Sequence, residues 1–271
     1  MNQSKPRNPA ETYEQYFVPA MFLPWATILL RHAAPQPRER VLDVACGTGI
    51  VSRLAAPMVG GDGQVFALDM NPAMLGVARA APPPSGAAIR WQEGNAMALP
   101  FPDRTFDIVL CQHGLQFVPD RAAAVREMRR ALAPGGRALV MVLQALARHP
   151  VFEALMESVA GHLALPISTV MTPFALSEAE ELRGLFTAAG FKTVDILPET
   201  ATVIFPDAQR FVPLAVASSA AAVPAFMQLG EPERAALLEA VRADVEPTIR
   251  RFVEADRVSF PMFAHIAMAT A

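Results

Sequence analysis

The chain has 271 residues, of which 52% are hydrophobic and 18% charged, and this balance excludes a globally disordered protein. The net charge of −3 provides no excess of positive charge for a nucleic-acid partner. Two cysteines are too few for a disulfide framework, and no signal-peptide pattern opens the chain, so a cytoplasmic location is expected. Polar and proline residues interrupt every apolar stretch before the roughly 20 residues that a membrane span requires.

Residues 9–34 predict a series of helical pieces rich in aromatic side chains. Pro19 and Pro24 each restart the helical pattern within this segment. The aromatic side chains belong to Tyr13, Tyr16, Phe17, Phe22 and Trp25. We expect residues 1–35 to form a helical lid ahead of the first strand.

From residue 36 onward, short apolar runs alternate with amphipathic helical patterns. Strands are expected at 40–45, 64–69, 89–92, 106–112 and 137–144. Helices are expected at 50–59, 72–80 and 120–136, the last ending in Pro-Gly-Gly. This alternation predicts right-handed crossovers and a mostly parallel sheet that is covered on both faces. The fold class is therefore α/β, a doubly wound, Rossmann-like unit over residues 36–144.

The rest of the chain is less regular but contains two further extended stretches. Helices are expected near 150–162, 177–190, 207–222 and 231–254, and strands near 192–205 and 259–271. The two late strands would complete the edge of a sheet of about seven strands. Residues 36–271 then form one domain, in which the helical regions 145–190 and 206–256 cover the substrate.

The sequence DVACGTG, residues 43–49, lies where the first strand ends. In an open α/β sheet, ligands bind outside the carboxyl ends of the strands. Gly47 and Gly49 allow a tight turn and a close approach of a ligand to the main chain. Asp69 ends the second strand, where a carboxylate can accept hydrogen bonds from both hydroxyls of a ribose. The pair predicts a cofactor that contains a nucleoside.

The glycine pattern bears on which cofactor is bound. Dinucleotide sites favour a third glycine at the position of Ser52, so the pattern disfavours a nicotinamide-dependent oxidoreductase. That class of enzyme is kept as an alternative.

Four blocks in this order carry a family resemblance: DVACGTG, ALDMNPAML, EGNAMALPFPDRTFDIVL and REMRRALAPGGRALV. Together they resemble the class I S-adenosylmethionine-dependent methyltransferases, in the small-molecule branch that includes the ubiquinone and menaquinone C-methyltransferases. The resemblance covers residues 36–144 well and the remainder only in layout. It implies an enzyme of class EC 2.1.1 that methylates an O, N or C atom of a small apolar or aromatic metabolite, as in secondary metabolism. S-adenosyl-L-methionine would be the donor and S-adenosyl-L-homocysteine the product.

The resemblance also implies a set of cofactor-binding residues. Asp43 would attract the amino group of the cofactor, and the side-chain oxygen of Asn95 would accept from the adenine amino group. Asp69 would take the ribose, and Gln112 would contact the methionine end. The full set is Asp43, Ala45, Cys46, Gly47, Thr48, Gly49, Asp69, Met70, Met74, Asn95, Ala96, Met97 and Gln112.

Acceptor-binding residues are implied by the segment CQHGLQFVPD, residues 111–120, after the fourth strand. The side chain of Gln116 cannot accept a proton at neutral pH, so His113 is the candidate for a titrating group in this segment. Tyr16 is a second catalytic candidate. A general base is needed only if the nucleophile carries a proton that it does not release. The implied substrate residues are Tyr13, Phe17, His113, Gln116 and Phe117.

Structural roles compete with several of these assignments. Asp43 could brace a loop, Asn95 could be a turn residue, and His113 could be a satisfied core residue. Core or surface roles are favoured for three histidines and for both cysteines, and no metal site is expected. These residues are His149, His162, His265, Cys46 and Cys111.

Two other protein classes remain as alternatives: a non-catalytic S-adenosylmethionine-binding protein, and an RNA or protein methyltransferase, which the acidic balance opposes. A small-molecule acceptor is the expected partner, and a homodimer is left open.

Overall fold

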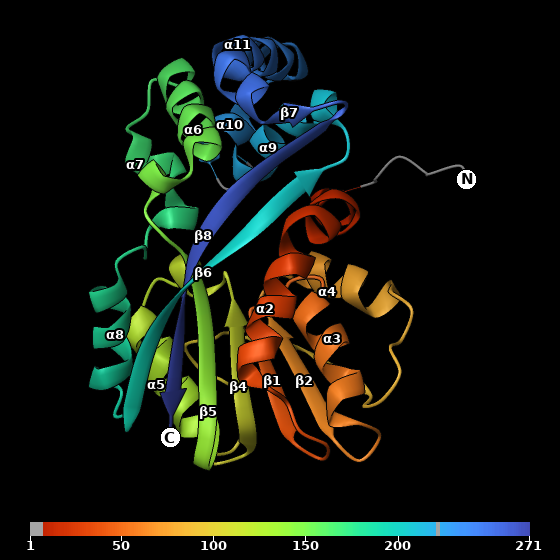
Figure 1. Ribbon diagram of the computed structural model, residues 1–271, viewed down its shortest axis with the longest axis vertical. Coiled ribbons are helices and arrows are strands. Elements are labelled where there is room, and N and C mark those ends of the chain that lie inside the picture. The colour runs from red at the N-terminus through yellow and green to blue at the C-terminus, as the bar shows by residue number, and fades with distance from the viewer. Residues whose placement is uncertain (1–7, 221–222) are drawn as a thin grey trace.

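The computed structural model describes residues 8–220 and 223–271, which form an α/β sheet structure with a helical cap (Figure 1). The strand order is β3-β2-β1-β4-β5-β8-β6, and the short strand β7 pairs with β8. Neighbouring strands among β1 to β5 are parallel, whereas β8 is antiparallel to β5 and β6. The strands are β1 (Arg40–Val44), β2 (Gln64–Asp69), β3 (Ile89–Glu93), β4 (Phe106–Gln112), β5 (Leu132–Leu143), β6 (Thr193–Phe205), β7 (Val253–Glu254) and β8 (Arg257–Thr270). The predicted α/β class and mostly parallel sheet are confirmed.

Helices cover both faces of the sheet. Successive strand residues point to opposite sides, and apolar residues on both sides need to be buried. Along β4, Ile108 and Leu110 belong to the core under α2 and α3, while Val109 and Cys111 belong to the core under α5 and α8. Figure 1 shows α2, α3 and α4 on one side and α5 and α8 on the other. These helices are α2 (Leu23–Ala33), α3 (Ile50–Val59), α4 (Pro72–Ala80), α5 (Arg121–Ala131) and α8 (Ala179–Ala188).

Two helices of this unit begin with a side-chain cap. Asn71 caps α4 by accepting a hydrogen bond from the Ala73 N–H, and Pro72 holds the first helical position. Asp120 caps α5 by accepting from the Ala123 N–H.

The predicted end of the 120–136 helix is wrong. α5 stops at Ala131, because the buried Leu132 already pairs with Phe106 and takes the chain into the sheet. The Pro-Gly-Gly stretch therefore lies inside β5, where the pairing shifts and Gly135 has a φ of +81°. Tertiary pairing at Leu132 outweighed the local signal for a helix end.

Strands β6 and β8 form a long hairpin that continues beyond the rest of the sheet. Their pairing runs from Thr193 and Thr270 to Phe205 and Val258. Figure 1 shows this hairpin rising into a cap of helices above the sheet. The cap helices are α6 (Pro150–His162), α7 (Ile167–Val170), α9 (Ala208–Ala220), α10 (Pro224–Gln228) and α11 (Glu231–Ile249), with 3-10 turns η3 (Leu146–Arg148), η4 (Thr172–Phe174) and η5 (Arg250–Phe252). The last two residues of the helix predicted at 207–222 lie outside the described residues.

The helix α8, which belongs to a region predicted to cover the substrate, lies on the sheet and not in the cap. α8 packs on the face of the sheet beside α5, with Leu182 and Phe186 fully buried there. The contribution of the 145–190 region to the cap therefore ends with η4, because the apolar side chains of α8 pack on the sheet.

The described part of the lid segment is one continuous helical stretch in front of β1. It consists of α1 (Pro9–Thr12), η1 (Tyr13–Phe22) and α2. η1 is π-helical, and the Leu23 N–H bonds the carbonyl of Val18, five residues back. Residues 1–7 of this segment lie outside the described residues. Within the described ranges, no helix has both the length and the apolar character to cross a bilayer.

Candidate active site

The glycine turn connects the end of β1 to the start of α3. Ala45, Gly47 and Gly49 all have positive φ angles, of 56°, 56° and 86°. The Cys46 N–H bonds the carbonyl of Leu68 at 3.0 Å, which ties the turn to the end of β2. The amino end of α3 therefore opens toward the carboxyl edge of the sheet, where backbone N–H groups favour a polar or anionic ligand.

The two glycines of the turn face different surroundings. A Cβ on Gly49 would lie 2.3 Å from Cη2 of Trp91, so the indole ring occupies that side of the turn. A Cβ on Gly47 would have its nearest neighbour 3.9 Å away, on Tyr13. Gly47 thus leaves an open cradle on the ligand side, whereas Gly49 is required for packing against Trp91.

Asp69 ends β2 beside this cradle and is only 8% exposed. Its Oδ2 accepts a hydrogen bond from the Gly47 N–H at 2.7 Å, and its Oδ1 accepts from the Asn71 N–H at 2.8 Å. Each carboxylate oxygen has a further lone pair, so Asp69 can still accept from two ribose hydroxyls. The carboxylate is held in place by the main chain.

Asp43 braces the first turn of α3. Its Oδ2 accepts from both the N–H and the hydroxyl of Ser52, at 3.1 and 2.6 Å. Burial raises the pKa of Asp43 to about 7, against the opposing effect of the Ser52 hydrogen bonds. The structure thus gives Asp43 the bracing role, with Ser52 as its partner; an additional contact with a cofactor amino group stays a prediction.

Five of the predicted cofactor-binding residues surround the ends of β2 and β3. Met70 is 73% exposed at the end of β2, an unusual position for a large apolar side chain, and Met74 is half-buried on α4. Asn95 is exposed, and its side-chain oxygen accepts from the Met97 N–H at 2.9 Å, as in a turn. The half-buried Ala96 and Met97 pack against the core. The oxygen of Asn95 therefore serves the turn, and its contact with adenine stays a prediction.

Several buried polar atoms at the ends of β1 and β4 have no hydrogen-bond partner among the described residues. They are Thr48 Oγ1, Gln112 Oε1, His113 Nδ1, His113 Nε2 and Gln116 Oε1. The amide nitrogen of Gln112 donates to the carbonyl of Phe22 at 3.1 Å, which leaves its oxygen free. Buried polar atoms without partners are rare in folded proteins, and a cluster of them indicates a ligand site.

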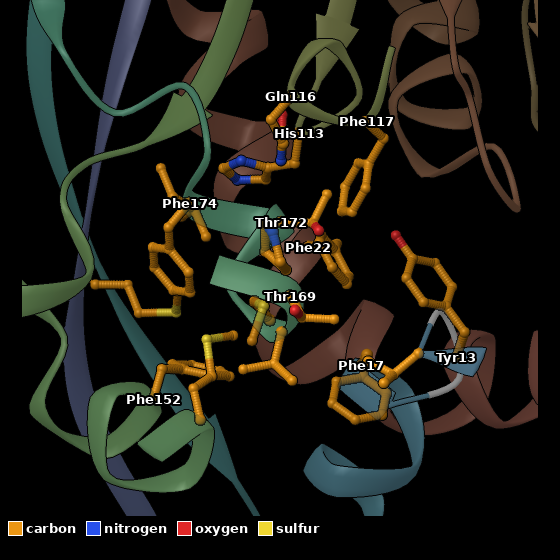
Figure 2. Close-up of a pocket in the computed structure, with 17 residues that line it drawn as sticks. Tyr13, Phe17, Phe22, His113, Gln116, Phe117, Phe152, Thr169, Thr172 and Phe174 are labelled. Carbon is orange, nitrogen blue, oxygen red and sulfur yellow. The ribbon is translucent and has the colours of Figure 1, made fainter. Parts of the chain in front are cut away.

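An apolar cavity of about 210 Å³ lies next to these atoms, between the sheet edge and the cap (Figure 2). An apolar cavity of about 150 Å³ is enough to hold benzene, so this one has room for a substituted aromatic ring. It is lined by Tyr13, Phe17, Met21, Phe22, His113, Gln116, Phe117, Leu143, Phe152, Met156, Thr169, Val170, Thr172, Pro173, Phe174, Val223 and Met262. The five predicted substrate residues Tyr13, Phe17, His113, Gln116 and Phe117 are all among them.

Tyr13 belongs to both the glycine cradle and the cavity. Its ring stacks on Phe22 with centroids 4.7 Å apart, and its side chain approaches Gly47. Burial and the nearby charge of Asp69 raise the pKa of its hydroxyl well above the ordinary value. The N-terminal segment therefore covers the turn and closes one side of the cavity.

Tyr16 does not join the other predicted site residues. Its hydroxyl accepts a hydrogen bond from Arg210 at 2.7 Å, and its ring lies under the same guanidinium. The side chain thus joins η1 to α9 and is not part of the cavity lining. Tyr13, Phe17 and Met21 are spaced four residues apart and line the cavity, whereas Tyr16 lies off this stripe.

His113 lies in the turn after β4 with a φ of +50°, an uncommon conformation for a residue with a side chain. Its N–H bonds the carbonyl of Met141 at 2.8 Å. The ring makes edge contacts with Phe22 and Trp25, with centroids 6.1 and 5.7 Å away. Burial, with a smaller effect of His149, lowers the pKa of His113 to about 3, so the imidazole is neutral at pH 7.

The other histidines and the cysteines take core or surface roles, as expected. His149 is buried and bonded to the main chain of Ala145 and Phe263, and His162 pairs with Asp244. His265 lies in β8, away from the cavity lining. Cys46 and Cys111 are free thiols whose pKa values are raised by burial.

No group of three metal-ligating side chains occurs in the ranges that the structure describes.

Sequence reasoning missed the cap residues of the site and the role of Trp91. Phe152, Phe174 and Thr172 come from the cap and reach the cavity only through tertiary packing. Trp91 had one available signal, since an aromatic residue on a strand beside a glycine turn is suited to pack over it.

Comparisons with known proteins agree with this geometry. The sequence profile of the methyltransferase domain matches residues 42–140. The ubiquinone/menaquinone biosynthesis C-methyltransferase UbiE from Shewanella woodyi is 32% identical over 185 residues, which are 63% of this chain and 73% of that protein. The chain belongs to the small-molecule branch of the class I S-adenosylmethionine-dependent methyltransferases. Membership in this family confirms the class predicted from the four sequence blocks.

Two further similar proteins show how far the similarity extends. The 2-phytyl-1,4-naphtoquinone methyltransferase of Synechococcus elongatus is 41% identical over 119 residues, or 43% of this chain. The chain spans about half the length of that relative, 51%. A phosphoethanolamine N-methyltransferase from Haemonchus contortus, solved with S-adenosylhomocysteine, has a TM-score of 0.58 at 17% identity, covering 96% of this chain and 56% of the other. This last likeness shows the methyltransferase fold.

Proposed function

We propose that this protein transfers the methyl group of S-adenosyl-L-methionine to a small aromatic metabolite of the quinone type. The observation that carries the proposal is that two sites meet at Tyr13. One is the glycine cradle with Asp69, and the other is the aromatic-lined cavity. A donor in the first and an acceptor in the second would lie side by side.

The residues of the cradle fit the proposed cofactor. The open side of Gly47 admits an amino-acid group, and the free oxygens of Thr48 and Gln112 supply hydrogen-bond acceptors, with the Thr48 hydroxyl also a donor. Asp69 is positioned for ribose hydroxyls, and the exposed Met70 for an adenine face. When bound, S-adenosylmethionine supplies a positively charged sulfonium whose methyl group a nucleophile can take in a single displacement.

The cavity fits an aromatic acceptor. Aromatic and thioether side chains line most of it, and the buried Phe17 and Phe174 help to exclude water from the reacting atoms. The relative from Synechococcus is named for a naphthoquinone and the one from Shewanella for ubiquinone and menaquinone biosynthesis, which supports a quinone-type ring here.

Calorimetric titration tests the cofactor assignment. S-adenosylmethionine and S-adenosylhomocysteine should bind at micromolar concentrations or tighter. Thr48→Val removes one buried hydroxyl and should weaken binding about 2- to 10-fold, the usual effect of one hydrogen bond. Thr27→Val, the same change at an exposed position on α2, is the matched control and should leave binding unchanged.

The acceptor is tested by incubating the protein with labelled S-adenosylmethionine and a panel of naphthalene- and benzene-ring quinones, phenols and amines. Methylated product is the expected result. Absence of binding of both cofactor forms would overturn the proposal. Tight binding without product across the panel would favour a non-catalytic binding protein, and a fluorescence response to reduced nicotinamide dinucleotide would favour an oxidoreductase.

A further inference from the structure

The cavity has a polar end and an apolar end. Figure 2 shows His113 and Gln116 together at one end and Phe152 at the opposite end. Gln116 is 3% exposed and comes from the turn η2 (Leu115–Phe117) that follows His113. A ligand in this cavity would therefore be held with one defined edge toward β4.

The polar end contains a buried hydrogen-bond acceptor that requires a donor from a ligand. Gln116 Oε1 is a buried acceptor without a partner, and a neutral His113 has one acceptor nitrogen and one N–H donor. A ligand hydroxyl can donate to one acceptor and accept from the imidazole N–H. A ligand carbonyl can only accept, so it would leave the Gln116 oxygen unpaired, which is unfavourable in a buried site.

The backbone at His113 argues against a purely structural role. A side chain at φ +50° is strained, and two unpartnered ring nitrogens add a desolvation penalty. The edge contacts with Phe22 and Trp25 could be made equally well by an apolar ring. Such a combination is typical of a residue held in place for a ligand.

His113 is also a poor proton acceptor where it stands. Phenolic hydroxyls have pKa values of about 10, and the pKa of His113 is about 3. The two values differ by about seven, so transfer of a phenolic proton to this imidazole is strongly uphill. The titratable groups nearby do not reverse this, since His149 lowers the pKa further.

We propose that His113 and Gln116 form a specificity site for a hydroxyl group on the aromatic acceptor, in which the uncharged imidazole orients this group by hydrogen bonding. The proposal rests on the proposed function, because it takes the cavity as the acceptor site. It assigns to these two residues the choice between hydroxyl-bearing rings and the corresponding ethers or carbonyl compounds. A quinone-type acceptor would therefore bind in its reduced, hydroxyl-bearing form.

Binding of matched ring compounds tests this site. 1-Naphthol, 1-methoxynaphthalene and naphthalene are titrated into the full chain saturated with S-adenosylhomocysteine. The wild type should bind 1-naphthol about 5- to 10-fold more tightly than 1-methoxynaphthalene, the effect of one buried hydrogen bond. Gln116→Leu and His113→Phe should each reduce this ratio toward one while leaving the affinity for naphthalene within about 2-fold.

Phe152→Leu is the matched control at the apolar end. It should weaken all three compounds together and leave the ratio unchanged. Thermal denaturation of each variant checks folding, and Gln116→Leu stands as an independent test if His113→Phe does not fold. A wild-type ratio near one, no binding of 1-naphthol, or a ratio that survives both substitutions would overturn the hydroxyl site.

The two proposals fail in different ways. If S-adenosylmethionine does not bind but the 1-naphthol preference persists without it and depends on Gln116, the methyltransferase function is overturned and the hydroxyl site is supported. If the cofactor binds and is turned over but the ring compounds show no such preference, the hydroxyl site is overturned alone.

Discussion

Replacing Gly49 with alanine should destabilise the fold more than the same replacement at Gly47. Both residues have positive φ angles, so alanine adds about 1–2 kcal/mol of backbone strain at either position. At Gly49 the new methyl group would also lie 2.3 Å from Cη2 and 2.5 Å from Cζ3 of Trp91. Moving a packed ring to relieve such a contact costs typically about 1–3 kcal/mol.

The expected difference between the two variants is therefore about 1–3 kcal/mol, because only Gly49 has the contact with Trp91. In a protein of this size, 1 kcal/mol changes the melting temperature by roughly 2–4 °C. Gly49→Ala should then melt roughly 2–12 °C below Gly47→Ala, measured by circular dichroism without ligand.

The Trp91→Leu background isolates the cause. Without the indole, both alanine variants have only the backbone strain, so the difference between them should disappear in a double-mutant cycle. Equal melting temperatures of the two single variants would refute the packing argument. A difference that persists in the Trp91→Leu background would refute it as well.

Three further predictions concern ligand binding, pH and the strained histidine. Gly47→Ala should raise the Kd of S-adenosylhomocysteine at least about 10-fold in calorimetry, because its methyl group enters the open cradle; an unchanged Kd would contradict this. The pKa of Asp43 is about 7 in the folded state and about 3.9 when unfolded, so the ligand-free protein should lose stability as pH rises from 4 to 7. Asp43→Asn should reduce the pH dependence of the free energy of unfolding, measured by denaturant titration. An unchanged pH dependence would show that another group causes it. His113→Gly should leave the melting temperature unchanged or raise it, because it removes a strained residue with two unpartnered ring nitrogens, while the rate of methyl transfer falls about 10-fold or more. If the histidine were structural, the substitution would lower the melting temperature.

The parallel half of the sheet could be predicted from the sequence because local signals and tertiary packing agree there. The strands expected at 64–69 and 106–112 have those bounds in the structure. Each is an apolar run between turn residues, buried on both faces. Where tertiary pairing starts early, as at Leu132, the local signal for a helix end gave the wrong boundary.

The candidate site was predictable only where it is contiguous in sequence. The glycine turn and Asp69 follow directly from strand ends. Phe152, Phe174 and Met262 come from separate segments that meet in the cap, and no spacing in the sequence brings them together. The position of Tyr16 depends on its contact with Arg210 of α9, a residue 194 positions away in the sequence.

The long β6–β8 hairpin supports a cap, so the two partners of the proposed reaction are bound by different segments of the chain. Apart from Tyr13, the glycine cradle comes from the stretch that begins at the end of β1 and ends with β4. Much of the cavity, in contrast, comes from the cap segments after β5 and between β6 and β8. Insertions at those two points can be lengthened, shortened or exchanged while the strand register below them stays the same. The architecture therefore lets acceptor preference diverge between lineages without disturbing the machinery that holds the donor.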